Sequence, residues 1–182
     1  MNNDLQSILV SEKEIEAITE RLGMQIYNDY KDSGKKLLLL TILKGAVLFS
    51  TDLMRKINLP IEIDFMKVSS YDAGTVSSGK INIHLDLKRT DLADVDIIIV
   101  EDIIDSGKTL SFLVDYLRQK GAHSVKTCTM LDKPSRREVE FTPDYCGRQI
   151  PDAFVVGYGL DYNEQYRHLP YIGILKPEMY GE

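Results

Sequence analysis

Apolar residues recur with two different periods along the first third of the chain. From Ser11 onwards they return every three or four positions, which predicts a helix that runs to about Gly34. Ser11 and Glu14 have the spacing of a capping box, the expected start of such a helix. Leu37 to Leu43 is then almost continuously apolar, as in a strand buried on both faces of a parallel sheet. A second helix is predicted over residues 46–57.

Residues 61–65 and 81–85 alternate apolar with polar side chains, which is the period of a strand with one wetter face. We expect these two segments to pair as antiparallel strands. Between them, six of the eleven residues 70–80 are Gly, Ser or Thr. A connection this long and permissive inside a hairpin is typical of a mobile or functional loop, so we interpret it as a candidate lid.

The second half of the chain continues to alternate strands with helices. Asp96 to Val100 has the pattern of a buried strand, and a short polar turn separates it from a helical spacing of apolar residues that starts at Leu110. Gly121 ends this predicted helix. Further strands are predicted at 125–131, 153–156 and 171–175. The alternation implies an α/β fold with a mostly parallel, twisted sheet flanked by helices.

The composition narrows the class of protein. A chain of 182 residues with 43% hydrophobic content fits one domain, residues 1–182. Its longest apolar runs are far shorter than the ~20 residues that a membrane helix needs. The N-terminus lacks the basic start and apolar run of a secretory signal, so we expect a cytoplasmic protein. Cys128 and Cys146 fit no metal-ligand spacing and are interpreted as reduced, structural thiols.

The net charge of −6 disfavours nucleic acid and anionic membranes as partners. A phosphate ligand would then have to be held by a few focused groups. Such groups come directly after the predicted strands, at Lys44-Gly45, Glu101-Asp102, Lys133-Pro134 and 157–161. Ligands of open α/β sheets bind beyond the carboxyl ends of the strands, so we expect a single site along one rim.

The most informative segment lies where the predicted strand at residue 100 meets the helix at residue 110. Free backbone N–H groups and the helix dipole favour an anion there, which predicts a phosphate cradle made by Asp105, Ser106, Gly107, Lys108 and Thr109. A nucleoside-triphosphate P-loop would need glycine where this chain has Asp102. The ligand is therefore expected to be a sugar phosphate, with the adjacent acids facing ribose hydroxyls and a metal. In the simpler interpretation, Glu101 and Asp102 only solvate a strand end and Asp105 caps the helix.

Val100 to Leu110 resembles the signature by which type I phosphoribosyltransferases bind 5-phosphoribosyl-1-pyrophosphate. The order and spacing of four further segments are similar to the hypoxanthine-guanine branch of that family: Leu43-Lys44-Gly45, Ser70-Tyr71, Lys133-Pro134 and 154–167. The resemblance covers nearly the whole chain. It implies the type I phosphoribosyltransferase fold, with a small hood and a flexible antiparallel hairpin loop.

The resemblance also implies a reaction, in which purine N9 displaces pyrophosphate from the anomeric carbon of the ribose. The residues that would bind phosphoribosyl pyrophosphate are Lys44, Gly45, Glu101, Asp102, Asp105, Ser106, Gly107, Lys108, Thr109 and Arg167. The implied cofactor is Mg²⁺: Glu101 and Asp102 would hold ribose hydroxyls that are linked to one ion, and Asp161 would hold a second ion on the pyrophosphate. Asp105 would act as general base or acid at purine N7.

The implied base site holds a 6-oxopurine through Lys133, Phe154, Val155 and Asp161. Lys133 would donate to the exocyclic O6, which selects against adenine. Phe154 would stack on the base, and Ser70 and Tyr71 would close over the reacting centre. Taken singly, a lysine at a strand end is usually solvated and an apolar strand residue is usually core.

Two other functions stay open at this point. An RNA-binding regulator on the same fold would need a basic face, and the best local concentration of cations is Lys133, Arg136 and Arg137. An enzyme for pyrimidine, orotate or adenine is disfavoured by Lys133 and by residues 154–161. The three histidines are too scattered for a metal triad and receive no role. The expected partners are the two small-molecule substrates, with no nucleic acid or membrane, and the family suggests a homodimer or homotetramer.

Overall fold

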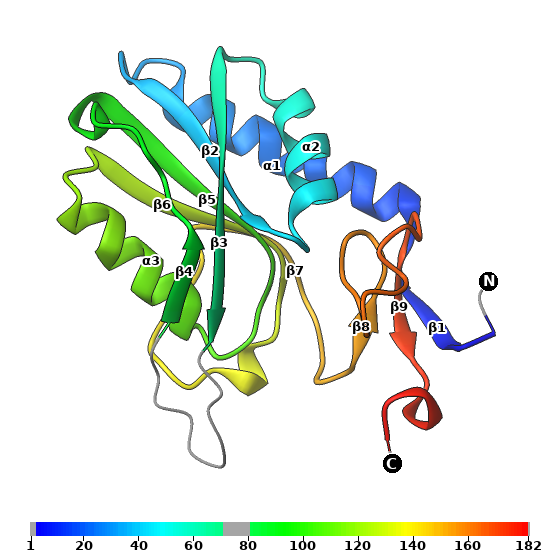
Figure 1. Ribbon diagram of the computed structural model, residues 1–182. Coiled ribbons are helices and arrows are strands. Elements are labelled where there is room, and N and C mark those ends of the chain that lie inside the picture. The colour runs from blue at the N-terminus through cyan, green and yellow to red at the C-terminus, as the bar shows by residue number, and fades with distance from the viewer. Residues whose placement is uncertain (1–2, 71–80, 182) are drawn as a thin grey trace.

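The computed structural model describes residues 3–70 and 81–181 (Figure 1). Its central sheet has the strand order β4-β3-β2-β5-β6-β7. The strands are β2 (Lys36–Leu43), β3 (Ile61–Ser70), β4 (Ile81–Leu85), β5 (Val95–Ile104), β6 (Ser124–Asp132) and β7 (Tyr145–Gln149). Neighbouring strands are parallel except for β3 and β4. The predicted α/β class with a mostly parallel sheet is confirmed.

Helices cover both faces of this sheet: α1 (Glu12–Tyr30) and α2 (Val47–Lys56) lie on one face, and α3 (Lys108–Gln119) lies on the other. Successive strand residues alternate between the two sides. Leu39 and Ile98 pack with α1 and α2, whereas Leu40 and Ile99 pack with α3. Because both faces are buried, the central strands need apolar side chains at every position. Short 3-10 helices occur at Leu92–Asp94, Pro134–Arg136 and Pro177–Met179.

The first helix begins where the sequence predicts. The backbone N–H of Ser11 donates to Glu14 Oε2 at 2.8 Å, and the N–H of Glu14 donates to Ser11 Oγ at 3.3 Å. This capping box satisfies two backbone donors that the helix itself leaves free. The helix ends at Tyr30, earlier than the predicted Gly34.

β3 and β4 are antiparallel, as predicted, but their register differs from the prediction. β4 pairs with residues 67–70, whereas residues 61–65 pair in parallel with β2. Neither face of residues 61–65 is fully covered, because Glu62 and Ile63 point to opposite faces of β3 and both are exposed. The predicted lid, including Tyr71, falls almost entirely on residues 71–80 and so lies outside the described residues.

β5 is longer than the predicted strand. It continues through Glu101 and Asp102 to Ile104, because β6 runs on beside it and pairs Ile104 with Asp132. The predicted polar turn therefore shrinks to residues 105–107. This places the acid pair on a rigid strand and not in a loop.

A second, antiparallel sheet has the order β1-β9-β8 and corresponds to the predicted hood. Its strands are β1 (Leu5–Val10), β8 (Val155–Val156) and β9 (Ile172–Leu175), and Figure 1 shows it beside the carboxyl end of β2. The strand predicted at 153–156 is thus shorter and belongs to the hood, not to the central sheet. β1 and β7 were not predicted, since β7 is short and mostly polar. Across 3–70 and 81–181, no helix is both long and apolar enough to cross a membrane.

Candidate active site

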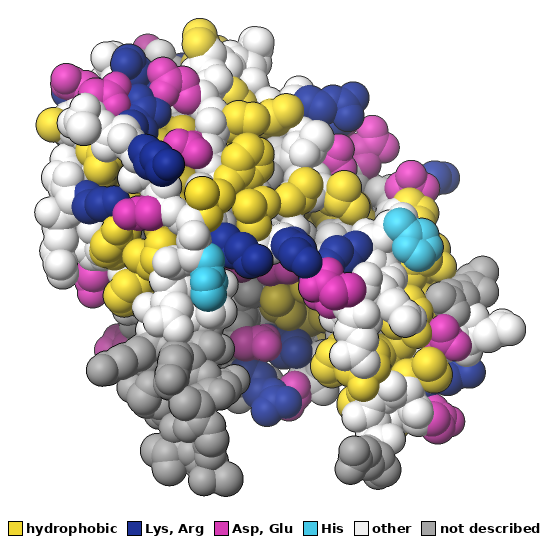
Figure 2. All heavy atoms as spheres, viewed as in Figure 1, with side chains coloured by type: hydrophobic (Ala, Val, Ile, Leu, Met, Phe, Trp, Pro, Cys, Tyr) yellow, Lys and Arg dark blue, Asp and Glu magenta, His cyan; other side chains and the backbone are white. Residues whose placement is uncertain are grey.

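Three separate segments of the chain meet at Gly45, just after β2. A Cβ atom on Gly45 would lie 1.6 Å from Asp102 Oδ2, and a Cβ atom on Gly159 would lie 2.0 Å from the Gly45 carbonyl oxygen. Only glycine fits at either position. The end of β2, the end of β5 and the hood loop that follows β8 are therefore in contact, as the expectation of one shared rim requires. Figure 2 shows a hollow between the two sheets, with basic and acidic side chains around it.

The acid pair on β5 is buried at its carboxyl groups, although each residue as a whole is only half-buried. Burial raises the pKa of Glu101 well above its usual range, and the charge of Asp102 adds to this shift. Burial also raises the pKa of Asp102, to about 6, although the Ile103 N–H donates to its Oδ1 at 2.8 Å. Among the described residues, Glu101 Oε2 has no hydrogen-bond partner.

An unpaired buried carboxyl oxygen beside a second carboxylate suits a cation or a ligand hydroxyl. Within the described parts of the chain, no group of three or more Asp, Glu, His or Cys side chains is placed to hold a metal ion. Mg²⁺ does not require such a cage, because it is usually bound by one or two carboxylates together with waters and substrate phosphates. Glu101 and Asp102 therefore fit Mg²⁺ that arrives with a phosphorylated ligand.

The predicted phosphate cradle lies between β5 and α3. Gly107 precedes α3 with φ +81°, a conformation that favours glycine, and as the N-cap it has no side chain to cap the helix. The Lys108 N–H makes a long hydrogen bond to Ser106 Oγ at 3.4 Å. A cavity of about 130 Å³ lies against this turn, and Glu101, Asp105, Ser106, Gly107 and Thr109 help to line it. The Lys108 side chain instead points to Glu138, with which it forms an ion pair. Backbone donors and two hydroxyls thus face one small cavity.

The segment that follows Lys133 braces the cradle from outside. The N–H groups of Glu138 and Val139 donate to the Ser106 carbonyl at 3.0 and 3.3 Å. The Arg137 guanidinium donates to the Asp105 carbonyl and also pairs with the buried Asp132. The sequence interpretation missed this role of Arg137. The sequence contains no signal for it, because the contact depends on how the chain returns after β6.

Lys133 and Asp105 were predicted separately for the base site, and the structure brings them together. Lys133 Nζ lies 3.6 Å from Asp105 Oδ1, and the Lys133 N–H donates to the Ile104 carbonyl at 2.9 Å. Lys133 is only 7% exposed, so the interpretation of a solvated strand-end lysine is wrong.

The basic side chains of the segment 133–137 are each paired with an acidic side chain. Lys133 faces Asp105, Arg136 Nε lies 2.9 Å from Asp152 Oδ1, and Arg137 pairs with Asp132. Arg136 also ties the turn after β6 to the segment that leads into the hood. These contacts leave no open basic face at 133–137 for an RNA backbone.

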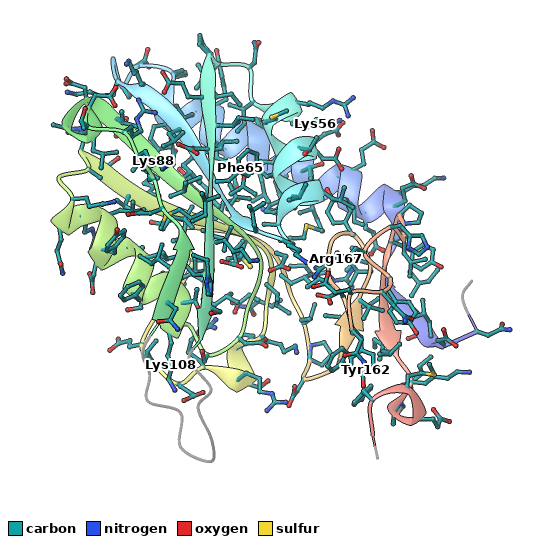
Figure 3. The ribbon with its side chains drawn as sticks, in the orientation of Figure 1. Lys56, Phe65, Lys88, Lys108, Tyr162 and Arg167 are labelled. Carbon is teal, nitrogen blue, oxygen red and sulfur yellow. The ribbon has the colours of Figure 1, made fainter. Side chains whose placement is uncertain are left out.

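The hood loop carries a second charged group. Arg167 Nη2 lies 2.7 Å from Asp161 Oδ1, and Arg167 Nη1 donates to the Gly159 carbonyl at 2.7 Å. Glu164 lies within 3.3 Å of Arg167 and within 2.9 Å of Lys44 Nζ. Figure 3 shows Arg167 beside the end of β2. The peptide bond between Leu43 and Lys44 is cis.

The aromatic part of the predicted base site also lies in the hood. Phe154 is 36% exposed, and its ring stacks on Tyr180 at a centroid distance of 4.7 Å. Tyr162 meets the same ring edge-on at 5.5 Å. Val155 is buried in β8, which leaves only its backbone for recognition. The sequence interpretation missed both tyrosines. Ser70 ends β3, and its predicted role and that of Tyr71 stay predictions.

Comparison with known proteins identifies the family. Residues 6–163 match the phosphoribosyl transferase domain family. The hypoxanthine-guanine phosphoribosyltransferase of Bacillus subtilis is 49% identical, over 99% of this chain and 98% of its own length. A crystal structure of a hypoxanthine phosphoribosyltransferase from Staphylococcus aureus has a TM-score of 0.93 at 46% identity, and the match covers 99% of this chain and 96% of that one. A hypoxanthine phosphoribosyltransferase of Trypanosoma cruzi has the same TM-score at 38% identity, with 99% and 96% covered.

Some relatives are much longer proteins. The bifunctional protein TilS/HprT of Listeria monocytogenes is 50% identical over the whole chain, yet the chain spans only 28% of its length. The acid pair, the cradle and Lys133 all lie within the matched residues 6–163. The chain belongs to the phosphoribosyl transferase family, alongside the hypoxanthine-guanine phosphoribosyltransferases.

Proposed function

We propose that residues 1–182 form one domain that transfers the 5-phosphoribosyl group from phosphoribosyl pyrophosphate to hypoxanthine or guanine. The products would be IMP or GMP and pyrophosphate, which is a reaction of purine salvage. The observation that carries the proposal is the Lys133–Asp105 pair, 3.6 Å apart, at the edge of a cradle built for a phosphate. Such a pair offers a donor and an acceptor to one face of a heterocyclic base.

The ribose 5-phosphate would be held by the central sheet. Its phosphate enters the cradle of residues 106–109, where the α3 dipole and the backbone N–H groups favour an anion. The ribose hydroxyls donate to Glu101 and Asp102, which gives the unpaired Glu101 Oε2 a partner. When Mg²⁺ is bound with the substrate, it supplies positive charge to the pyrophosphate oxygens. Glu101 and Asp102 would hold one Mg²⁺ at the ribose, and Asp161 would hold a second Mg²⁺ at the pyrophosphate.

The purine would lie between Phe154 and the Lys133–Asp105 pair. Lys133 donates to O6, and Asp105 exchanges a proton with N7 as charge shifts on the ring, a role worth a factor of about 10² to 10⁴ in rate. Adenine carries an amino group where a 6-oxopurine has O6, so it would offer the buried Lys133 no acceptor on the base. The Val155 backbone would read the edge of the base. This predicts selectivity for 6-oxopurines.

Pyrophosphate would leave toward the hood loop. Backbone donors of Lys44 and Gly45 and the guanidinium of Arg167 would hold it, because Arg can bind two phosphate oxygens side by side. We further propose that the protein acts in the cytoplasm as a homodimer or homotetramer, which sedimentation of the purified chain would test. The T. cruzi relative has been studied for the effect of its C-terminal region on oligomeric state and activity.

The decisive experiment is steady-state formation of nucleoside monophosphate from phosphoribosyl pyrophosphate and Mg²⁺. Hypoxanthine, guanine, xanthine, adenine and uracil are offered separately. Turnover with 6-oxopurines alone supports the proposal and ranks the substrates. Turnover with adenine or uracil would contradict the role of Lys133, and a folded protein that turns over no base would contradict the proposed function itself.

A further inference from the structure

The carboxylate of Glu164 lies between the side-chain cations of Lys44 and Arg167. The proposed function assigns the Lys44 backbone and the Arg167 guanidinium to pyrophosphate, and we add the Lys44 ammonium to these groups. Glu164 Oε1 is 2.9 Å from Lys44 Nζ, and its Oε2 is 3.3 Å from Arg167 Nη2. One carboxylate therefore bridges a cation from the end of β2 and a cation from the hood loop. Two phosphate oxygens of a bound pyrophosphate would make the same pair of contacts.

Glu164 is placed in this position by its own turn and not by the cations. Its N–H donates to Asp161 Oδ2 at 2.8 Å, and its φ of +62° is an unusual conformation for a residue other than glycine. The turn from Asp161 to Arg167 thus aims the carboxylate at Lys44. Asp161 and Gly159 hold the same guanidinium at 2.7 Å each, so Arg167 would stay in place if Glu164 moved away.

The contacts of Glu164 are of a kind that a stronger anion can displace. Its side chain is 64% exposed and that of Lys44 is 52% exposed, and exposed ion pairs contribute little stability. Pyrophosphate carries more negative charge than one carboxylate. It would therefore replace Glu164, but only after breaking both contacts.

We propose that Glu164 is an internal competitor for the pyrophosphate group: it occupies Lys44 and Arg167 in the empty site, weakens binding of the diphosphate and speeds its release. This inference rests on the proposed function, because that function places pyrophosphate against the Lys44 backbone and the Arg167 guanidinium. Glu164 is a residue that sets affinity and does not take part in the chemical step.

The test is calorimetric binding of inorganic pyrophosphate, with Mg²⁺, to the full chain and to Glu164→Gln. Loss of the two exposed contacts should tighten binding by about threefold to tenfold. Glu20→Gln is the matched control, since it removes the same charge from an exposed carboxylate that lies 2.8 Å from Lys56 Nζ, on α1. The control should bind pyrophosphate as the unmodified chain does.

The outcomes separate this inference from the proposed function. Equal or weaker pyrophosphate binding by Glu164→Gln, with normal turnover of a 6-oxopurine, overturns the competitor role and leaves the proposed function intact. If Glu164→Gln and Glu20→Gln bind pyrophosphate more tightly by the same factor, the effect comes from net charge, and the competitor role is again overturned. If the unmodified chain binds no pyrophosphate, the site assignment fails and the inference fails with it.

Discussion

The two halves of the candidate site are built in different ways. On the central sheet, Glu101 and Asp102 belong to a paired strand, and the turn after it is braced by hydrogen bonds from residues 137–139. In the hood, Glu164 and Arg167 belong to a loop held largely by its own turns and ion pairs. The half that would hold the phosphate, the ribose and the Lys133–Asp105 pair is thus preorganised, whereas the hood half can exchange the contacts that would hold pyrophosphate.

This difference suits a transfer reaction. The ribose 5-phosphate is common to substrate and product, so a fixed cradle serves both. Pyrophosphate must leave, and the two side chains beside its proposed position already have a partner within the protein, because Lys44 and Arg167 are paired with Glu164. Binding of pyrophosphate exchanges one set of contacts for another, which keeps net affinity moderate. The base would instead stack on Phe154, one face of which is supported by Tyr180.

The largest expected effect comes from the fixed half. Asp105→Asn keeps the size of the side chain but removes the proton acceptor at N7. We expect turnover to fall by about 10²-fold to 10⁴-fold while binding of phosphoribosyl pyrophosphate is retained. Steady-state rates and calorimetric binding measure the two quantities. Weak binding with normal turnover would contradict the assigned role, and Asp152→Asn is a suitable surface control.

A smaller effect, on the pH dependence of stability, is expected from the buried acid pair Glu101 and Asp102 on β5. In the metal-free protein, the folded-state pKa values of Glu101 and Asp102 lie above their ordinary values, so the folded state binds more protons than the unfolded state. Stability should therefore fall as pH rises from about 4 through the raised pKa values, the Asp102 value being about 6. Glu101→Gln removes a carboxyl group that must ionise while buried, and so removes most of this loss of stability at high pH.

We expect metal-free Glu101→Gln to be more stable than the unmodified chain at pH 8, by on the order of 1–3 kcal/mol, and nearly equal to it at pH 4. Urea unfolding in the presence of a chelator at both pH values is the measurement. The same substitution should lower turnover, because a ribose ligand is lost. Parallel stability profiles for the two proteins would show that the Glu101 carboxyl is solvated and not buried.

The accuracy of the sequence predictions follows the same division. The cradle of residues 105–109 was predicted because its groups are contiguous and stand where an apolar strand meets an amphipathic helix. The strand itself was predicted to end too early, since two acids look like a turn until β6 is known to continue beside them. Arg137, Glu164 and Tyr180 were missed because each acts through a contact between segments distant in sequence, and no local period marks such a contact.

The smallest expected effect tests the exchangeable half. Tyr180 covers one face of Phe154 at 4.7 Å with nearly parallel rings, which restricts the orientation of the Phe154 ring. Stacked aromatic pairs contribute about 0.5–1.5 kcal/mol beyond their burial, so Tyr180→Ala should raise KM for the purine by roughly twofold to tenfold. Tyr180→Phe keeps the ring and should behave as the unmodified chain. The KM for phosphoribosyl pyrophosphate and kcat should not change, because the cradle and Asp105 lie on the central sheet. If KM for phosphoribosyl pyrophosphate rose together with KM for the purine, the hood and the central sheet would not act as separate halves of the site.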